Sequence, residues 1–225
     1  MAPEAIDPGL LCHTGTMDPT RTFVSLPMPP GVRRAIEDLR VRHAAAGPSG
    51  WRWPAGHQAH LTMAFLGDLD EAALMRARAC ARRAARRASP FEADLRGAGA
   101  FPSAARARVV WLGWGAGAAE VGGLHAQLAR ELEATGFELD RRRFHPHVTL
   151  ARARAPLDAR PLLHALTSWR SAAWTVAAIE LMASRLTPAG AVHTRLERCE
   201  LGGGANGPAA GKRPPRASAQ DPDVT

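Results

Sequence analysis

Apolar residues recur along the chain with two different periods, which separate strands from helices. Runs of strand length occupy residues 22–26, 58–67, 91–96, 109–114, 144–152, 174–185 and 192–199. Patterns of helical period occupy residues 31–46, 70–88, 119–135 and 157–168. Pro30 is placed to open the first helix, and Gly136 to end the third. Several strands follow one another without a helix between them, which favours an α+β fold over a doubly wound parallel sheet.

The central part of the chain, residues 21–201, carries this periodicity, and the two ends do not. Residues 1–20 lack an apolar face, and residues 202–225 are rich in Gly, Ala, Pro and scattered charge. Such segments cannot bury enough apolar surface to offset the entropy lost on ordering. We therefore expect two disordered ends around one cooperative unit, and we expect that unit to be a monomer.

Composition argues against several classes of protein. No run approaches the roughly 18 consecutive apolar residues of a membrane span, and residues 1–20 lack the regions of a signal peptide. We therefore expect no membrane association and a cytoplasmic location. Cys12, Cys80 and Cys199 are widely spaced, which predicts buried or inert thiols rather than a zinc site or a disulfide framework. Lys212 is the only lysine, so the folded body lacks the lysine that a nucleotide-binding P-loop requires.

The chain is strongly basic, with 29 Lys and Arg against 21 Asp and Glu. A basic surface attracts polyanions such as RNA, but the dominance of arginine fits a biased amino-acid composition equally well. The arginines of the helix predicted at 70–88 favour a solvated helix face over a ligand site. Charge alone therefore leaves the partner open.

Two predicted strands carry the same short motif. Residues 60–62 read His-Leu-Thr and residues 147–149 read His-Val-Thr. Side chains alternate across a strand, so the histidine and threonine of each motif share one face, and Leu61 or Val148 points to the other. Two imidazoles can supply the acid and the base that hydrolysis of a cyclic phosphodiester needs near neutral pH. Threonine hydroxyls can donate hydrogen bonds to the phosphate oxygens.

With these motifs the chain resembles the 2H phosphoesterase superfamily, in particular the bacterial and archaeal RNA 2',3'-cyclic phosphodiesterases, also called 2'-5' RNA ligases. The likeness extends from Arg21 to about Leu201 and includes residues 65–67, 101–102, 108–111 and 144–152. It implies two pseudo-symmetric lobes whose antiparallel sheets line a central cleft, with helices packed outside. It also implies these roles: His60 as proton donor to the leaving oxygen, His147 as proton acceptor from water, and Thr62, Thr149 and Arg152 as phosphate-binding groups.

The resemblance implies hydrolysis of RNA 2',3'-cyclic phosphate ends to 2'-phosphate ends, without a metal or another cofactor. Weak ATP-independent 2'-5' RNA joining is implied as a second activity. The expected partners are RNA with cyclic phosphate ends or small cyclic nucleotides. Two alternatives stay open: the same chemistry on 2'-5' oligonucleotides or small cyclic nucleotides, and a non-catalytic RNA-binding module. Ala59 and residues 55–58 depart from the family pattern, which bears on substrate preference.

Four further residues have simpler interpretations. His57 is close to the first motif, but no third ligand at a characteristic spacing accompanies it, so we expect no metal site. His145 is expected to be structural. Trp111 and Trp114 are three apart in a strand and point to opposite faces. We expect core packing for them, with base stacking open to one.

Overall fold

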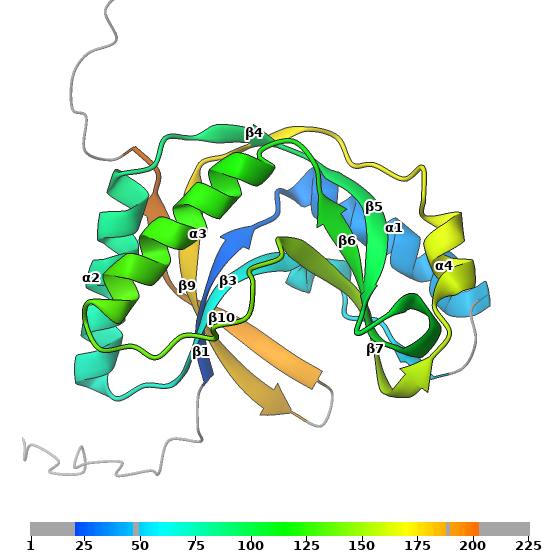
Figure 1. Cartoon of the computed structure of the whole chain (residues 1–225), viewed down its shortest axis with the longest axis horizontal. Coiled ribbons are helices and arrows are strands. Elements are labelled where there is room, and N and C mark those ends of the chain that lie inside the picture. The colour runs from blue at the N-terminus through cyan, green and yellow to red at the C-terminus, as the bar shows by residue number, and fades with distance from the viewer. Residues whose placement is uncertain (1–20, 47–49, 188–189, 203–225) are drawn as a thin grey trace, which may run out of the picture.

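The computed structural model describes residues 21–46, 50–187 and 190–202 (Figure 1). Residues 1–20 and 203–225, which include Cys12, Lys212 and all but Gly202 of the ends predicted to be disordered, lie outside the described residues, so the domain boundaries stay predictions. In chain order the elements are β1 (Arg21–Pro27), α1 (Pro30–Ala46), β2 (Trp51–Arg52), the 3-10 turn η1 (Gly56–Gln58), β3 (His60–Asp68), α2 (Glu71–Arg86), β4 (Phe91–Ala93), β5 (Leu95–Phe101), the 3-10 turn η2 (Ala104–Arg106), β6 (Ala107–Trp114), α3 (Ala118–Glu133), β7 (His147–Leu157), α4 (Arg160–Ala165), β8 (Trp174–Val176), β9 (Ala178–Thr187) and β10 (Gly190–Glu200).

The principal sheet has the strand order β10-β9-β1-β3-β7-β6-β5, with β2 alongside β7. Strands β4 and β8 form a separate pair. Every pairing within the described ranges is antiparallel, which confirms the predicted α+β class. The two halves of the principal sheet meet at one registered pair, Leu61 opposite Val148. The two predicted lobes therefore join at the middle residues of the two motifs.

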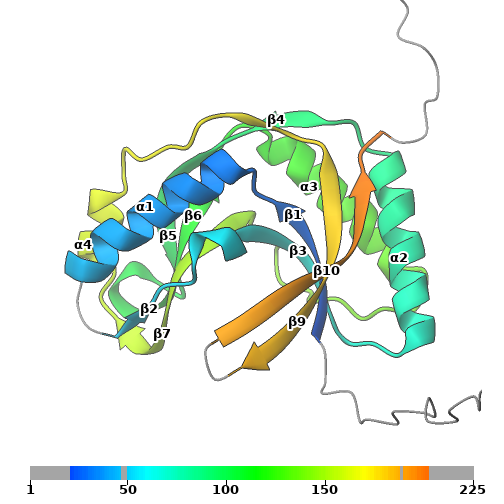
Figure 2. The ribbon, with the colours of Figure 1, turned by 180° about the vertical axis from the view of Figure 1, so that it is seen from behind.

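The helices cover the outside of this arched sheet, as Figures 1 and 2 show from opposite sides. Helices α2 and α3 pack together against the half that contains β3, β9 and β10. Helices α1 and α4 lie beside the other half, where α4 contacts β5. This arrangement leaves the opposite face of the sheet free of helices where the two halves meet.

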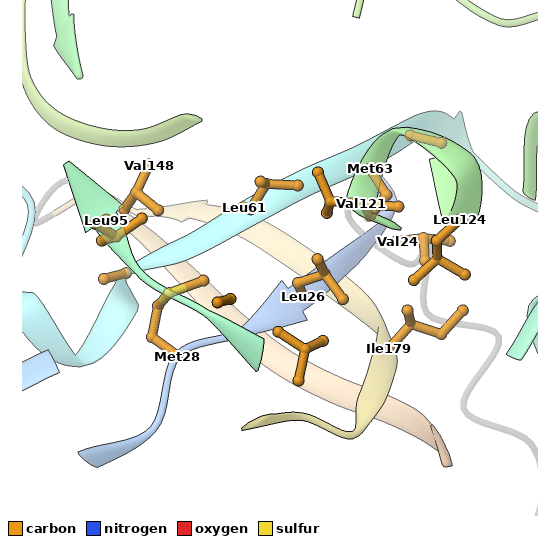
Figure 3. Close-up of a cluster of buried hydrophobic side chains, with 14 of the residues drawn as sticks. Val24, Leu26, Met28, Leu61, Met63, Leu95, Val121, Leu124, Val148 and Ile179 are labelled. Atoms are coloured by element: carbon orange, nitrogen blue, oxygen red, sulfur yellow. The ribbon is translucent and has the colours of Figure 1, made fainter. Parts of the chain in front are cut away.

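The hydrophobic core lies between the sheet and the helices (Figure 3). Val24, Leu61, Val148 and Ile179 are completely buried there. Each such side chain contributes about 2 kcal/mol to folding. A slip of β3 by one residue would exchange Leu61 for His60 in the core, so the burial of Leu61 strongly fixes the register.

Two predicted strands are each divided in the structure. The run at 91–96 breaks at Asp94, whose carboxylate accepts hydrogen bonds from Arg96 and from the amide of Ala116. The run at 174–185 breaks between β8 and β9. Since β4 pairs with β8 while β5 and β9 belong to the principal sheet, the chain changes sheets at each break. A period of two does not reveal such a change of partner.

Several predicted boundaries were also wrong. Strand β3 begins at His60, because residues 56–58 form a 3-10 turn. Strand β7 begins at His147, since Pro146 has no amide hydrogen to give to the ladder. It continues to Leu157, which leaves α4 only six residues long. Both motif histidines are consequently the first residues of their strands. The two-residue strand β2 was not predicted.

The arginines of α2 have a structural role that the sequence did not indicate. Arg83 and Arg87 contact the Glu131 carboxylate of α3 at 2.6 and 2.7 Å. Arg78 and Arg82 pair with Glu197 of β10. These ion pairs connect α2 to α3 and to β10. Two further predictions are confirmed, since Cys80 and Cys199 are buried free thiols.

Candidate active site

The polar residues of the two motifs lie on one face of the sheet. Leu61 and Val148 face each other across the junction, and both are fully buried. Their sequence neighbours therefore point to the opposite side. This side, which we call the motif face, carries His60 and Thr62 from β3 and His147 and Thr149 from β7, all partly exposed. An antiparallel register through the junction sets the histidine of each motif beside the threonine of the other.

The same hydrogen bond holds each motif histidine. His60 Nδ1 lies 2.7 Å from the carbonyl oxygen of Gln58, and His147 Nδ1 lies 2.7 Å from the carbonyl oxygen of His145. A carbonyl oxygen can only accept, so Nδ1 carries the hydrogen in both rings. Nε2 is then the nitrogen available for proton transfer in each ring. The sequence did not indicate these carbonyl partners, which belong to the backbone just before each strand.

Two aromatic rings surround His60. The Phe23 ring of β1 lies 5.0 Å from the His60 ring and is tilted by 30°. The His193 ring of β10 lies 5.2 Å away and is nearly perpendicular, at 83°. Phe23 and His193 also contact each other at 5.2 Å. His193 is far from both motifs in sequence, and no local pattern around it predicted this position.

Aromatic rings also surround His147. The Phe101 ring lies 5.2 Å away at 83°, and the Trp111 ring lies 6.1 Å away. Trp111 further contacts His145 at 4.5 Å between ring centroids. Trp111 therefore lies beside the motif face, and the core packing that we expected for it was wrong. The same expectation is confirmed for Trp114, a partly buried residue packed against the core.

Gly99 of β5 makes room for the Trp111 ring. The two residues are paired across β5 and β6. A Cβ atom at position 99 would lie 2.2 Å from the Trp111 ring. Glycine is therefore required there for the aromatic wall beside His147.

Burial makes both motif histidines hard to protonate in the free protein. Loss of hydration lowers the pKa of His60 to about 4, although the bond to Gln58 acts in the opposite direction. Burial also lowers the pKa of His147, again against its carbonyl bond. The positive charge of Arg152 adds to both effects. Both rings are thus uncharged near neutral pH, and a bound anion would favour their protonated forms.

Arg152 supplies a positive charge to the motif face. Its Nη2 donates to Thr149 Oγ1 at 3.3 Å, and loss of hydration lowers its pKa. None of the carboxylates in the described ranges forms an ion pair with it. A guanidinium without a carboxylate partner, beside a threonine hydroxyl, can bind a phosphate. The structure therefore brings Arg152 to Thr149 and near both motif histidines.

In the described part of the chain, no group of three His, Cys, Asp or Glu side chains is arranged to hold a metal ion. None of its helices is both long enough and apolar enough to cross a membrane.

The fold is α+β, and each half of its antiparallel sheet contributes one His-x-Thr motif to a common face. These two features define the 2H phosphoesterase class. The chain belongs to the 2'-5' RNA ligase superfamily, which matches residues 28–187. This finding confirms the predicted resemblance.

Individual relatives are similar over most of their length. The chain is 36% identical over 194 residues to the RNA 2',3'-cyclic phosphodiesterase of Thermus thermophilus, covering 81% of this chain and 91% of that protein. It is 36% identical over 140 residues to the protein of that name from Aeropyrum pernix, covering 61% and 78%. Escherichia coli LigT, solved in complex with 3'-AMP, superposes with a TM-score of 0.67 at 28% identity, covering 82% and 99%.

Proposed function

We propose that this protein is an RNA 2',3'-cyclic phosphodiesterase that opens the cyclic phosphate at an RNA end to a 2'-phosphate by two-histidine acid-base catalysis. The observation that carries the proposal is the matched pair of Nδ1 hydrogen bonds on His60 and His147. They leave one Nε2 atom from each half of the sheet for proton transfer. The names of the relatives from Thermus thermophilus and Aeropyrum pernix support the substrate class.

The reaction needs one proton acceptor and one proton donor. His147 Nε2 accepts a proton from the attacking water as the new P–O bond forms. The bond from phosphorus to the ribose 3' oxygen breaks, and His60 Nε2 donates a proton to that oxygen. Since the pKa of His60 is about 4 in the free protein, its donor role requires the negative charge of the bound phosphate to raise that pKa.

Three residues are suited to hold the phosphate. The hydroxyls of Thr62 and Thr149 donate hydrogen bonds to the non-bridging oxygens, whose charge rises in the transition state. Arg152 adds a full positive charge next to Thr149. The same groups support 2'-5' joining, in which the 5' hydroxyl of a second RNA replaces water and no ATP is consumed.

A neighbouring cavity favours an RNA chain as the partner. It has a volume of about 320 Å³ and is lined in part by Pro27, the strand partner of His60. Arg33, Arg195 and Arg198 also line it; Arg195 and Arg198 pair with Glu180, and Arg198 also pairs with Glu200. Arg33 has no ion pair among the described residues, and its positive charge suits the phosphates of a nucleic acid strand that leads away from the motif face.

The proposal is tested by hydrolysis of cyclic-ended RNA and 2',3'-cyclic nucleotides by purified protein in EDTA. Replacing His60 or His147 by alanine should each lower kcat by on the order of a hundredfold to ten-thousandfold, with little change in binding. The double variant should be little worse than either single one. Thr62→Ala or Thr149→Ala should cost on the order of tenfold to a thousandfold.

His164→Ala is the matched control, because His164 is exposed on α4, and it should keep full activity. Near-normal turnover by folded His147→Ala would contradict the proposal and favour a non-catalytic RNA-binding role. Activity that is lost in EDTA and restored by a divalent ion would contradict the metal-independent mechanism.

A further inference from the structure

A third histidine completes the surroundings of His60. His193 lies in β10, opposite Ser184 of β9. Its ring meets both the His60 ring and the Phe23 ring at centroid distances of 5.2 Å and at steep angles of 83° and 79°. The three rings therefore form one cluster, which draws its members from β1, β3 and β10.

The Nδ1 atom of His193 is buried and has no hydrogen-bond partner among the described groups. Protonation at this atom would place an unpaired N–H donor in the interior, which is costly. Burial accordingly lowers the pKa of His193. His193 thus presents an uncharged ring to its neighbours near neutral pH.

Gln58 connects the strand of His193 to the hydrogen bond that holds His60. Its side-chain Nε2 donates to the Ala191 carbonyl of β10 at 2.7 Å. Its own carbonyl accepts from His60 Nδ1. Ala191 and His193 are two residues apart on one strand, so β10 contacts His60 directly through a ring and indirectly through Gln58.

The imidazole neighbour of His147 differs from that of His60 in its origin along the chain. Its nearest imidazole, that of His145, lies 6.2 Å away on the segment that also supplies the carbonyl partner. The ring against His60, in contrast, comes from a strand far away in sequence. The two motif histidines are therefore alike in their hydrogen bonds and unlike in their imidazole neighbours.

We propose that His193 is a positioning residue for His60, which fixes the orientation of its ring and couples its protonation to that of a second imidazole. This inference rests on the proposed function of His60 as a proton-transfer group. The other charged groups that act on His60 are Arg152 of β7 and Arg33 of α1. Replacing His193 leaves both arginines in place, so its own contribution can be measured.

The test uses two substitutions in the full chain. His193→Phe keeps a ring of similar shape but removes the titrating nitrogens, and His193→Ala removes the ring. NMR of the His60 ring Cε1–Hε1 group, followed against pH without substrate, measures the protonation of His60 directly. Its midpoint should rise in both variants, because a second imidazole no longer competes for the proton.

Turnover tests the orientation of the ring. His193→Ala should lower kcat by about tenfold while KM changes by less than about twofold, and His193→Phe should recover most of that loss. His164→Ala should change neither readout. An unchanged His60 midpoint in both variants, or full kcat in folded His193→Ala, would overturn the inference. Absence of hydrolysis by the wild-type protein would instead overturn the proposed function, since the titration needs no turnover.

Discussion

At the scale of single residues, the imidazole of His60 is under two opposing influences. The Gln58 carbonyl favours its protonated form, and burial opposes that form more strongly, so its pKa falls to about 4. An ordinary histidine, as in the unfolded chain, titrates near pH 6.5. Between these two values the unfolded chain binds a proton that the folded protein does not, and folding stability depends on pH as a result.

The sign of this dependence gives the first prediction. His60 contributes stability that is fully present above pH 6.5 and is lost as the pH falls toward 4. The loss amounts to about 1 to 3 kcal/mol. Urea unfolding of wild-type protein and His60→Phe at pH 7.5 and pH 4.5 measures it. The wild type should lose more stability than the variant between these pH values, and equal losses would show that His60 titrates normally.

The second prediction concerns the space beside Trp111. Gly99→Ala should displace the indole ring, because the added methyl would lie 2.2 Å from it. We expect a destabilisation of about 1 to 3 kcal/mol and a lower kcat through the neighbouring His147. Thermal unfolding and hydrolysis rates measure both effects.

Gly122→Ala on α3 is the matched control for this substitution. A Cβ atom at position 122 would have nothing within 4 Å. Since alanine favours a helix interior more than glycine does, this variant should be stabilised by up to about 1 kcal/mol. Equal behaviour of the two variants would contradict the packing argument.

The motif residues could be predicted from the sequence, and much of their surroundings could not. His-x-Thr in an apolar strand has a defined geometry, because alternation alone puts both polar side chains on one face. Phe23 and His193 reach His60 only through the pairing of β1 with β3 and of β9 with β10. The carbonyl groups of Gln58 and His145 are backbone atoms, which have no signature in the sequence.

At the scale of elements, helices were easier to predict than strands. The three long helices lie within a few residues of the predicted ranges, since a helix satisfies its backbone hydrogen bonds within itself. A strand depends on a partner elsewhere in the chain. The runs at 91–96 and 174–185 change partner at Asp94 and Ala177, and local periodicity does not record which strand is opposite.

The third prediction concerns the attachment of α2 to α3. The Glu131 carboxylate contacts Arg83 and Arg87, and its side chain is 12% exposed. Glu131→Gln removes the charge but keeps the shape, so we expect a loss of roughly 1 kcal/mol, reduced because both arginines are partly in solvent. Urea unfolding measures the loss. Asp140→Asn, in an exposed pair with Arg142, should have no measurable effect, and equal effects of the two substitutions would contradict the assignment.

At the scale of the whole molecule, the fold concentrates its chemistry at the junction of two half-sheets. Each half supplies one histidine and one threonine, and among the described residues the pair Leu61 and Val148 sets the register between the halves. The relative position of the two imidazoles therefore depends on how the halves pack. The chain as a whole carries a formal net charge of +8, which attracts polyanions.

The fourth prediction distinguishes long substrates from short ones by this charge. Binding of a single-stranded nucleic acid releases counterions, so the logarithm of its affinity falls with the logarithm of salt concentration by about 0.7 for each phosphate contacted. A cyclic-ended oligonucleotide that reaches the cavity lined by Arg33, Arg195 and Arg198 should show a clearly steeper dependence than a 2',3'-cyclic mononucleotide. Measurements of KM for both substrates between 50 and about 200 mM salt test this. Arg33→Gln should reduce the slope for the oligonucleotide and leave that for the mononucleotide nearly unchanged. Equal slopes for the two substrates in the wild type would show that the protein contacts the terminal phosphate only, and would favour small cyclic nucleotides as the substrate class.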